Sequence, residues 1–259
     1  MTTALIYHDV APAAAQPATG FAGAAPGRYK LTPEQFDAHL AAIAAAGVSV
    51  GLVADRPQAA LTFDDGGDSA LVAAEALERR GWRGHFFITT GRIGTPGFVT
   101  AEGVRELDRR GHCVGSHSHS HPTYMGTLSA AELADEWGRS RTVLTEIIGR
   151  APATAAVPGG FLSEQVIAQA AACGYTLLMT SQPTLRARAH HGMAVHGRFT
   201  IWGMTTPSRA AAYARGDARA RTSMWLAWQG KTAAKRLNPA LYEGLRQRWA
   251  RGRAGGRPR

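Results

Sequence analysis

The chain has 259 residues, of which 45% are hydrophobic and 19% are charged, and its formal net charge is +10. A chain of this length and apolar content can bury a large core and suits one large α/β domain, and two domains are possible but not required. It holds no apolar run of about 18 residues, which argues against a transmembrane helix. Its two cysteines, Cys113 and Cys173, lack the spacing of a metal site and predict buried free thiols.

The positive charge is concentrated in the C-terminal part of the chain. Residues 1–208 hold 16 Lys and Arg against 17 Asp and Glu, a net of −1, whereas residues 209–259 hold 13 against 2, a net of +11. The overall positive charge therefore does not indicate what kind of substrate residues 1–208 would bind, because this part of the chain is nearly neutral. It indicates a basic surface that could meet anionic lipid or nucleic acid, and a solvated arginine-rich tail is the alternative.

The N-terminal residues predict a strand and then a long loop. Residues 4–7 form an apolar run that delivers His8 and Asp9 to its carboxyl end. Residues 11–27 are rich in Ala, Gly and Pro and lack periodicity, so we expect a mobile flap over a site or a disordered segment. The capping box Thr32-Pro33-Glu34-Gln35, with Pro at the first helical position, predicts the start of a helix.

From residue 48 onward, strand-like runs alternate with helical ones, as expected for a parallel sheet. The predicted strands are 48–53, 59–63, 85–89, 113–115, 155–157 and 175–180. The predicted helices are 69–80, 101–110, 129–149 and 163–173. Because functional groups of β/α barrels gather at the carboxyl ends of the strands, we expect an α/β fold with a distorted (β/α) barrel. A doubly wound open sheet is the alternative.

The predicted strand 59–63 ends on two adjacent carboxylates, Asp64 and Asp65, followed by Gly66. Neighbouring side chains at a strand end point in different directions, so that one carboxylate can hold a metal ion while the other acts as a base. Taken alone, the pair is also typical of an acidic turn or a helix N-cap. The histidines that follow the strand 113–115 favour the first interpretation.

These histidines are His117, His119 and His121. On a helical turn, His117 and His121 would share one side, which is the usual spacing of two ligands of one metal ion. On an extended segment all three imidazoles would share a face, and His119 would be a third ligand. Pro122 favours the turn. Two histidines and one carboxylate leave positions open for water and substrate.

Two motifs carry a resemblance to a known family, Thr62-Phe63-Asp64-Asp65-Gly66 and His117-Ser118-x-x-His121-Pro122. They resemble the first two motifs of the NodB-homology polysaccharide deacetylases, carbohydrate esterase family 4, in the family's order. The resemblance implies that Asp64 is the catalytic base. It also implies that Asp65, His117 and His121 hold a divalent metal ion, for which Zn²⁺ is the first expectation, in a barrel of the NodB type.

Two further motifs, of which the second is degraded, bear on the remaining catalytic groups. Ile6-Tyr7-His8-Asp9 resembles the family's Leu-x-His motif, placed at the N-terminus as in a circularly permuted branch, and implies that His8 is the general acid. His196, late in the chain, is its rival. Residues 156–160 stand where the family has Arg-x-Pro-x-Gly. This match implies that the N–H of Gly159 faces the oxyanion, while Ala156 leaves Asp64 without the usual arginine.

These implications predict a metal-dependent hydrolase that removes N-acetyl groups from amino sugars of a glycan or lipid-linked saccharide. One rival is a non-catalytic metal- or glycan-binding member of the same fold, against which the retained Asp64 argues. The other is nucleic-acid binding through the basic tail, against which the neutral body argues. We expect the deacetylase domain over residues 1–205 and a basic helical extension over residues 206–259.

Two expectations concern the place of action. Residues 1–9 lack the features of a secretory signal, so we expect a cytoplasmic protein. The basic extension mixes apolar side chains with cations in a pattern that suits helices lying on an anionic membrane surface, here the inner membrane face. These residues are Trp225, Trp228, Leu241, Leu245 and Trp249 with Lys231, Lys235, Arg236, Arg246 and Arg248. The alternative is that the tryptophans pack on the barrel.

Overall fold

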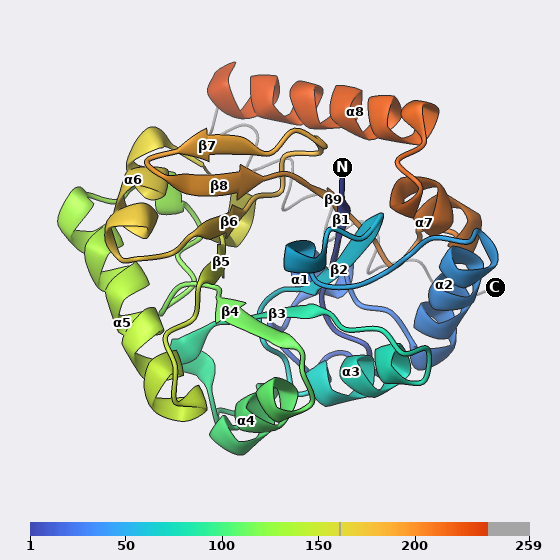
Figure 1. Cartoon of the computed structure of the whole chain (residues 1–259), viewed down its shortest axis with the longest axis horizontal. Helices are drawn as coiled ribbons and strands as arrows, with labels where there is room; N and C mark the ends of the chain where they lie inside the picture. Colours follow the sequence, from blue (N-terminus) through green and yellow to red (C-terminus); the bar gives the residue numbers. More distant parts are fainter. Residues whose placement is uncertain (161, 238–259) are drawn as a thin grey trace.

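Short strands alternate with helices around one central sheet (Figure 1). The computed structural model describes residues 1–160 and 162–237. Its strands are β1 (Thr3–Tyr7), β2 (Ala59–Phe63), β3 (His85–Ile88), β4 (Cys113–Ser116), β5 (Thr154–Ala156), β6 (Leu177–Met179), β7 (Arg188–His190), β8 (Met193–His196) and β9 (Arg198–Thr200). Its helices are α1 (Ala24–Gly27), α2 (Pro33–Ala45), α3 (Ala70–Glu78), α4 (Ala101–Arg109), α5 (Ala130–Ile148), α6 (Glu164–Ala172), α7 (Pro207–Ala214) and α8 (Ala218–Leu237).

The sheet confirms the predicted β/α arrangement. The strand order is β7-β8-β6-β5-β4-β3-β2-β1-β9, and every neighbouring pair is parallel except β7 with β8. Strands β1 to β6 thus lie side by side in their order along the chain. Crossovers of one hand then place the connecting helices on one face, whereas a doubly wound sheet needs helices on both faces.

Gly197 closes the sheet into a barrel. Strand β8 pairs with β6 and β9 pairs with β1, yet Gly197 alone separates β8 from β9. One continuous segment therefore bridges the two ends of the parallel sheet. A Cβ at Gly197 would approach the carbonyl oxygen of Gln182 to 2.4 Å, so the closure requires a residue without a side chain.

The predicted helix starts are confirmed by their caps. The Thr32 hydroxyl accepts a hydrogen bond from the Gln35 N–H and the Gln35 side chain accepts one from the Thr32 N–H, which completes the capping box of α2. Ser129 and Glu132 make the same reciprocal pair at α5. Such a box satisfies backbone donors that the first turn of a helix leaves without partners.

One expectation about the secondary structure needs correction. The strand predicted over 48–53 is wrong, because Val50 makes a single bridge to Ala59 and the chain then enters a 3₁₀ turn at Val53–Asp55. Helix α7 begins just after the boundary expected at residue 205, and its buried residues join the same core cluster as α2 and β1. The body of the fold therefore continues through α7. None of the described helices is long and apolar enough to cross a bilayer.

Candidate active site

The double Asp and the histidine loop meet at the carboxyl ends of β2 and β4. Asp65 Oδ1 lies 3.4 Å from His117 Nε2 and 3.4 Å from His121 Nε2. The candidate ligand atoms of the three residues all lie within 4.8 Å of one another, a spacing that one metal ion can span. Asp65 and His117 are buried and the side chain of His121 is 21% exposed, so this barrel-mouth cluster opens to solvent beside His121.

The backbone of the cluster is held in uncommon conformations. Asp65 has φ 76°, Ser118 φ 62° and His121 φ 62°, all in the left-handed region that side chains with a Cβ rarely adopt. Such residues cost about 1–3 kcal/mol each and concentrate at functional sites. The helical turn predicted for the histidines is wrong, because the residues after β4 form a loop. The turns at Ser118 and His121, and not helical spacing, bring the two imidazoles to Asp65.

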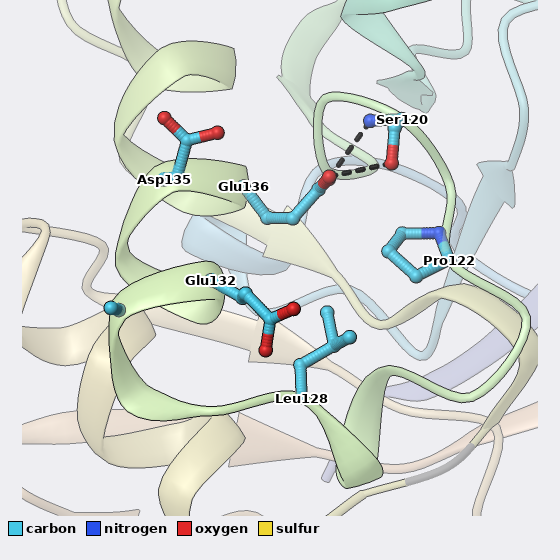
Figure 2. Close-up of a pocket in the computed structure, with 7 residues that line it drawn as sticks. Ser120, Pro122, Leu128, Glu132, Asp135 and Glu136 are labelled. Carbon is cyan, nitrogen blue, oxygen red and sulfur yellow. Dashed lines mark hydrogen bonds between the residues drawn. The ribbon is translucent and has the colours of Figure 1, made fainter.

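Hydrogen bonds from neighbouring elements fix the histidine loop. The Nδ1 atom of His117 lies 3.0 Å from the carbonyl oxygen of Ala156 on β5, so this nitrogen carries the proton and Nε2 is left as a ligand atom. Glu136 of α5 accepts a hydrogen bond from the N–H of His119 at 2.9 Å. It also accepts hydrogen bonds from the N–H of Ser120 at 2.8 Å and from the Ser120 hydroxyl at 2.5 Å (Figure 2). Glu136 also lines an open cavity of about 520 Å³, together with Ser120 and Pro122 of the loop.

His119 points away from the cluster. Its Nδ1 atom lies 3.1 Å from the hydroxyl oxygen of Thr90, and its carbonyl oxygen accepts a hydrogen bond from the N–H of Gly91 at 2.8 Å. It is therefore not the third ligand that an extended segment would have made it.

Asp64 is paired with a buried arginine that the sequence did not suggest. Arg198 on β9 is fully buried, and its guanidinium donates to both carboxylate oxygens of Asp64, at 2.6 and 2.8 Å. It also donates to the hydroxyl of Thr62 at 2.9 Å and to the carbonyl oxygen of Thr180 at 3.2 Å. Burial alone would raise the pKa of Asp64, but the charges of Arg198 and His117 outweigh it and the pKa is lowered.

Arg198 thus makes the contact that Ala156 cannot make. The Phe87 ring packs with Ala156 and lies 5.4 Å below the Arg198 guanidinium, so both positions border the same part of the barrel interior. The family's usual arginine is replaced here by Ala156, and Arg198 on β9 orients Asp64 in its place. The sequence does hold one sign of this contact, an arginine in the apolar run 198–201. A cation in a buried strand needs an anionic partner.

His8 leaves β1 at the same rim as Asp64. Tyr7 stands opposite Phe63 in the sheet and the Asp64 N–H donates to the Tyr7 carbonyl oxygen at 3.0 Å, so the next residue of each strand emerges side by side. The His8 ring stacks on Tyr29 with centroids 4.6 Å apart. Its Nδ1 atom is buried and has no hydrogen-bond partner among the described residues. Stacking, and not a hydrogen bond to Nδ1, therefore orients this imidazole.

His196 lies at the opposite rim. Arg198 stands opposite Ala4 in the sheet, which places His196, two residues earlier, at the level of Thr2, before β1 begins. It is buried, its Nδ1 atom lies 2.7 Å from the carbonyl oxygen of Gly197, and burial is the main cause that lowers its pKa. His8 and not His196 therefore shares the rim with Asp64.

The loop over residues 11–23 is packed beside the cluster, and is not the disordered segment that its composition allows. The ammonium of Lys30, which is 4% exposed, donates to two backbone carbonyls of the loop and lies 3.7 Å from Asp9 Oδ2. Phe21 of this loop lies with its ring centroid 4.5 Å from that of His121.

Gly159 lies in an exposed turn after β5 with φ 63°.

Similarity to known proteins covers the part of the chain that carries the barrel-mouth cluster. Residues 53–178 match the family described as polysaccharide deacetylase. The part of the chain over these residues belongs to the polysaccharide deacetylase family. The matched span contains Asp64, Asp65, His117 and His121 but neither His8 nor Arg198, so membership of the permuted branch stays a prediction.

The curated relatives of the matched part are deacetylases of larger size. A chitin deacetylase of a Pestalotiopsis species is 30% identical over 129 residues, which cover 49% of this chain and 42% of that protein. The peptidoglycan-N-acetylglucosamine deacetylase PgdA of Listeria monocytogenes is 34% identical over 110 residues, which cover 41% of this chain and 22% of that protein. The matches thus span less than half the length of these relatives.

Several solved structures share the fold. The deacetylase PplD of Streptococcus pyogenes aligns with a TM-score of 0.64 at 21% identity, over 80% of this chain and 94% of that one. IcaB from Ammonifex degensii aligns with a TM-score of 0.65 at 21% identity, over 83% and 97%. A polysaccharide deacetylase from Bacillus cereus aligns with a TM-score of 0.69 at 17% identity, over 82% and 68%. At these identities the likeness shows the fold.

Proposed function

We propose that this protein is a metal-dependent hydrolase that removes N-acetyl groups from amino sugars of a glycan or lipid-linked saccharide. One observation carries the proposal: a buried, arginine-paired carboxylate lies beside a cluster that suits a metal ion, with Asp64 Oδ2 4.0 Å from His117 Nε2. A protein that only binds metal needs Asp65 but does not need Asp64. The buried charge of Asp64 carries a desolvation penalty, which argues for a function of this carboxylate. The deacetylase names of the relatives support this reaction.

Asp65, His117 and His121 would hold the metal ion, for which Zn²⁺ is the first expectation. Two imidazole nitrogens and one carboxylate oxygen are a donor set that suits such an ion, and the bond from His117 to Ala156 fixes the imidazole as metal sites require. When bound, the ion supplies Lewis acidity to the acetyl carbonyl oxygen and to the attacking water.

Asp64 accepts the proton of the attacking water. Its lowered pKa keeps it ionised at neutral pH, and the two hydrogen bonds from Arg198 fix the carboxylate plane. A weakly basic carboxylate is sufficient because the water itself is acidified at such a site. The N–H of Gly159 donates to the oxyanion that forms as the water oxygen bonds to the acetyl carbon.

His8 donates a proton to the nitrogen of the sugar when the C–N bond breaks. Without that proton the amine would be a very poor leaving group. The products are acetate and the free amino sugar. Tyr29 holds the imidazole by stacking, which leaves the Nε2 side of the ring to face the leaving group.

Exchange of each carboxylate tests the two roles separately. Asp65→Ala should lose both metal and acetate release, whereas Asp64→Asn should keep the metal and lose acetate release because only the base is missing. Metal content and acetate release from a panel of N-acetylated oligosaccharides measure both. Wild-type acetate release by Asp64→Asn would contradict the assignment and favour the non-catalytic alternative.

A second pair of variants tests the general acid. His8→Ala should lower the rate by about a hundredfold or more with the metal retained, in keeping with acid–base contributions. His196→Ala should change the rate little, because His196 lies at the other rim. The reverse result would identify His196 as the general acid, late in the chain as in the unpermuted branch of the family.

We also propose that the protein works in the cytoplasm at an anionic membrane surface. Among the described residues, α8 presents Trp225 at 42% and Leu226 at 59% exposure on a helix that carries several cations. The predicted residues from Leu241 onward lie outside the described residues. Sedimentation with anionic vesicles that weakens as salt rises would support this proposal. Equal sedimentation with neutral vesicles would contradict it.

A further inference from the structure

A second group of two histidines and one carboxylate lies on the surface, where α6 meets the β7–β8 hairpin (Figure 1). Glu164 is the first residue of α6, His190 ends β7, and His191 lies in the turn to β8. The Oε1 atom of Glu164 lies 2.9 Å from His191 Nε2 and 3.3 Å from His190 Nδ1. All three candidate ligand atoms lie within 4.8 Å of one another. We call these residues the surface cluster.

The spacing of the surface cluster fits a small metal ion. Ligand atoms at about 2.0–2.1 Å around a tetrahedral ion are separated from one another by about 3.4 Å. The two distances to Glu164 Oε1, 2.9 and 3.3 Å, are close to this value. The corresponding distances in the barrel-mouth cluster are both 3.4 Å. An ion could therefore enter the surface cluster with small side-chain movements.

The hairpin turn brings the second imidazole into place at a conformational cost. His191 has φ 49° and the next residue, Gly192, has φ 74°, so both central residues of the turn are left-handed. In two-residue hairpin turns of this kind the first position usually carries Asn, Asp or Gly, which tolerate a positive φ. Histidine at this position is strained, and the strained residue is one of the two that contact Glu164.

We propose that Glu164, His190 and His191 form a second metal site, which takes a divalent transition ion such as Zn²⁺. Imidazole nitrogen and carboxylate oxygen are ligands that these ions prefer. The side chains are 64%, 37% and 48% exposed, so the site binds its ion more weakly than the buried barrel-mouth cluster does. Binding needs neutral imidazoles and therefore strengthens as pH rises through the range in which histidine titrates.

An ion at this site would join two elements that follow the candidate active site. It would tie the start of α6, which comes after the turn that carries Gly159, to the end of the β7–β8 hairpin. Because the ion binds only the folded arrangement, it stabilises the protein by mass action. The surface cluster is thus a site for ion-dependent stability, and it does not need the proposed reaction to be correct.

Zinc titration of the full-length chain, stripped with a chelator and followed by calorimetry, tests the second site. Asp65→Asn disables the barrel-mouth cluster, and this variant should still bind one equivalent of Zn²⁺. Adding His191→Asn, which keeps a residue suited to a positive φ, should abolish that binding. Arg188→Gln, on the same hairpin but not a ligand, is the matched control and should keep it.

Thermal unfolding gives an independent measurement. Zn²⁺ should raise the melting temperature of Asp65→Asn and leave that of Asp65→Asn/His191→Asn unchanged. If Asp65→Asn does not fold, the wild type and His191→Asn replace the pair, with two equivalents expected for the first and one for the second. Equal zinc binding with and without His191 would overturn the proposal, as would the absence of any zinc binding by folded Asp65→Asn.

Discussion

The barrel-mouth cluster and the surface cluster have the same donor types and nearly the same spacing, but different surroundings. Asp65 and His117 are buried, and hydrogen bonds to Ala156 and Glu136 hold the histidine loop. In the surface cluster, by contrast, Glu164 is the one polar partner that the described residues offer to either imidazole. The ligand set alone therefore does not distinguish a catalytic site from a surface ion site.

The groups around the ligands make that distinction. Beside the barrel-mouth cluster lie a carboxylate paired with a buried arginine, Asp64, and an imidazole at the same rim, His8. A base and an acid on either side of a polarised carbonyl are what amide hydrolysis needs. The surface cluster has no such pair among the described residues, and an ion there can stabilise the fold but has no groups with which to transfer protons.

The largest effect should come from removing Arg198, which pairs with Asp64, the proposed base. In Arg198→Met, burial is no longer opposed by the guanidinium, so the pKa of Asp64 rises. We expect the acid limb of the pH–rate profile to move to higher pH and kcat/KM at neutral pH to fall about a hundredfold. Arg188→Met, beside the surface cluster, is the matched control and should leave the profile unchanged. An acid limb that does not move in Arg198→Met would show that the ionisation of another group, and not of Asp64, determines this limb.

The same variant should lose stability in a pH-dependent way. Because the pKa of Asp64 is lower in the folded protein than its ordinary value, ionised Asp64 stabilises the fold at neutral pH, and this contribution is lost as pH falls through the folded pKa. Removing one partner of a buried pair costs about 3–5 kcal/mol. Denaturant unfolding should show Arg198→Met less stable than Asp64→Asn/Arg198→Met, which leaves no uncompensated charge. The opposite order would contradict a buried ion pair.

A smaller effect is expected from the carboxylate that supports the histidine loop. Glu136→Gln keeps the shape of the side chain but loses the charge that three donors of the loop share. We expect zinc affinity at the barrel mouth to fall about 10–100-fold, the usual effect of changing a group that orients the ligands. Calorimetry in a His191→Asn background measures this site alone. Asp135→Asn, one residue earlier and paired at the surface with Arg139, should bind zinc as before.

The smallest effect concerns the Tyr29 ring that stacks on His8, the proposed general acid. Tyr29→Ala removes the surface on which His8 stacks, and we expect kcat to fall about tenfold while zinc binding at both clusters is unchanged. Tyr29→Phe keeps the ring and should retain most of the rate. Histidine resonances in nuclear magnetic resonance spectra would show whether the His8 imidazole gains mobility in Tyr29→Ala alone. Equal rates for the two variants would exclude a positioning role for the ring.

The sequence predicted what is local and failed where contacts are remote. The capping box of α2, most strands and the two motifs each lie within a few neighbouring residues. The structure brings the candidate metal ligands of the two motifs together. Arg198 could not be placed in the same way, because its contact with Asp64 joins residues 134 positions apart. The helical turn predicted for the histidines failed for a different reason, since positive φ values at Ser118 and His121 override what spacing suggests.

The closure at Gly197 has a consequence for the order of folding. Strand β9 pairs with β1, and Arg198 stands opposite Ala4 in the sheet. These two residues are far apart in the sequence. Contacts of such separation form late, because the entropy of closing the intervening chain must first be overcome. The guanidinium that orients Asp64 therefore arrives with the last strand pairing. An incompletely folded chain already contains both motifs in its sequence, yet the Asp64 carboxylate gains its partner only when the ring of strands is complete.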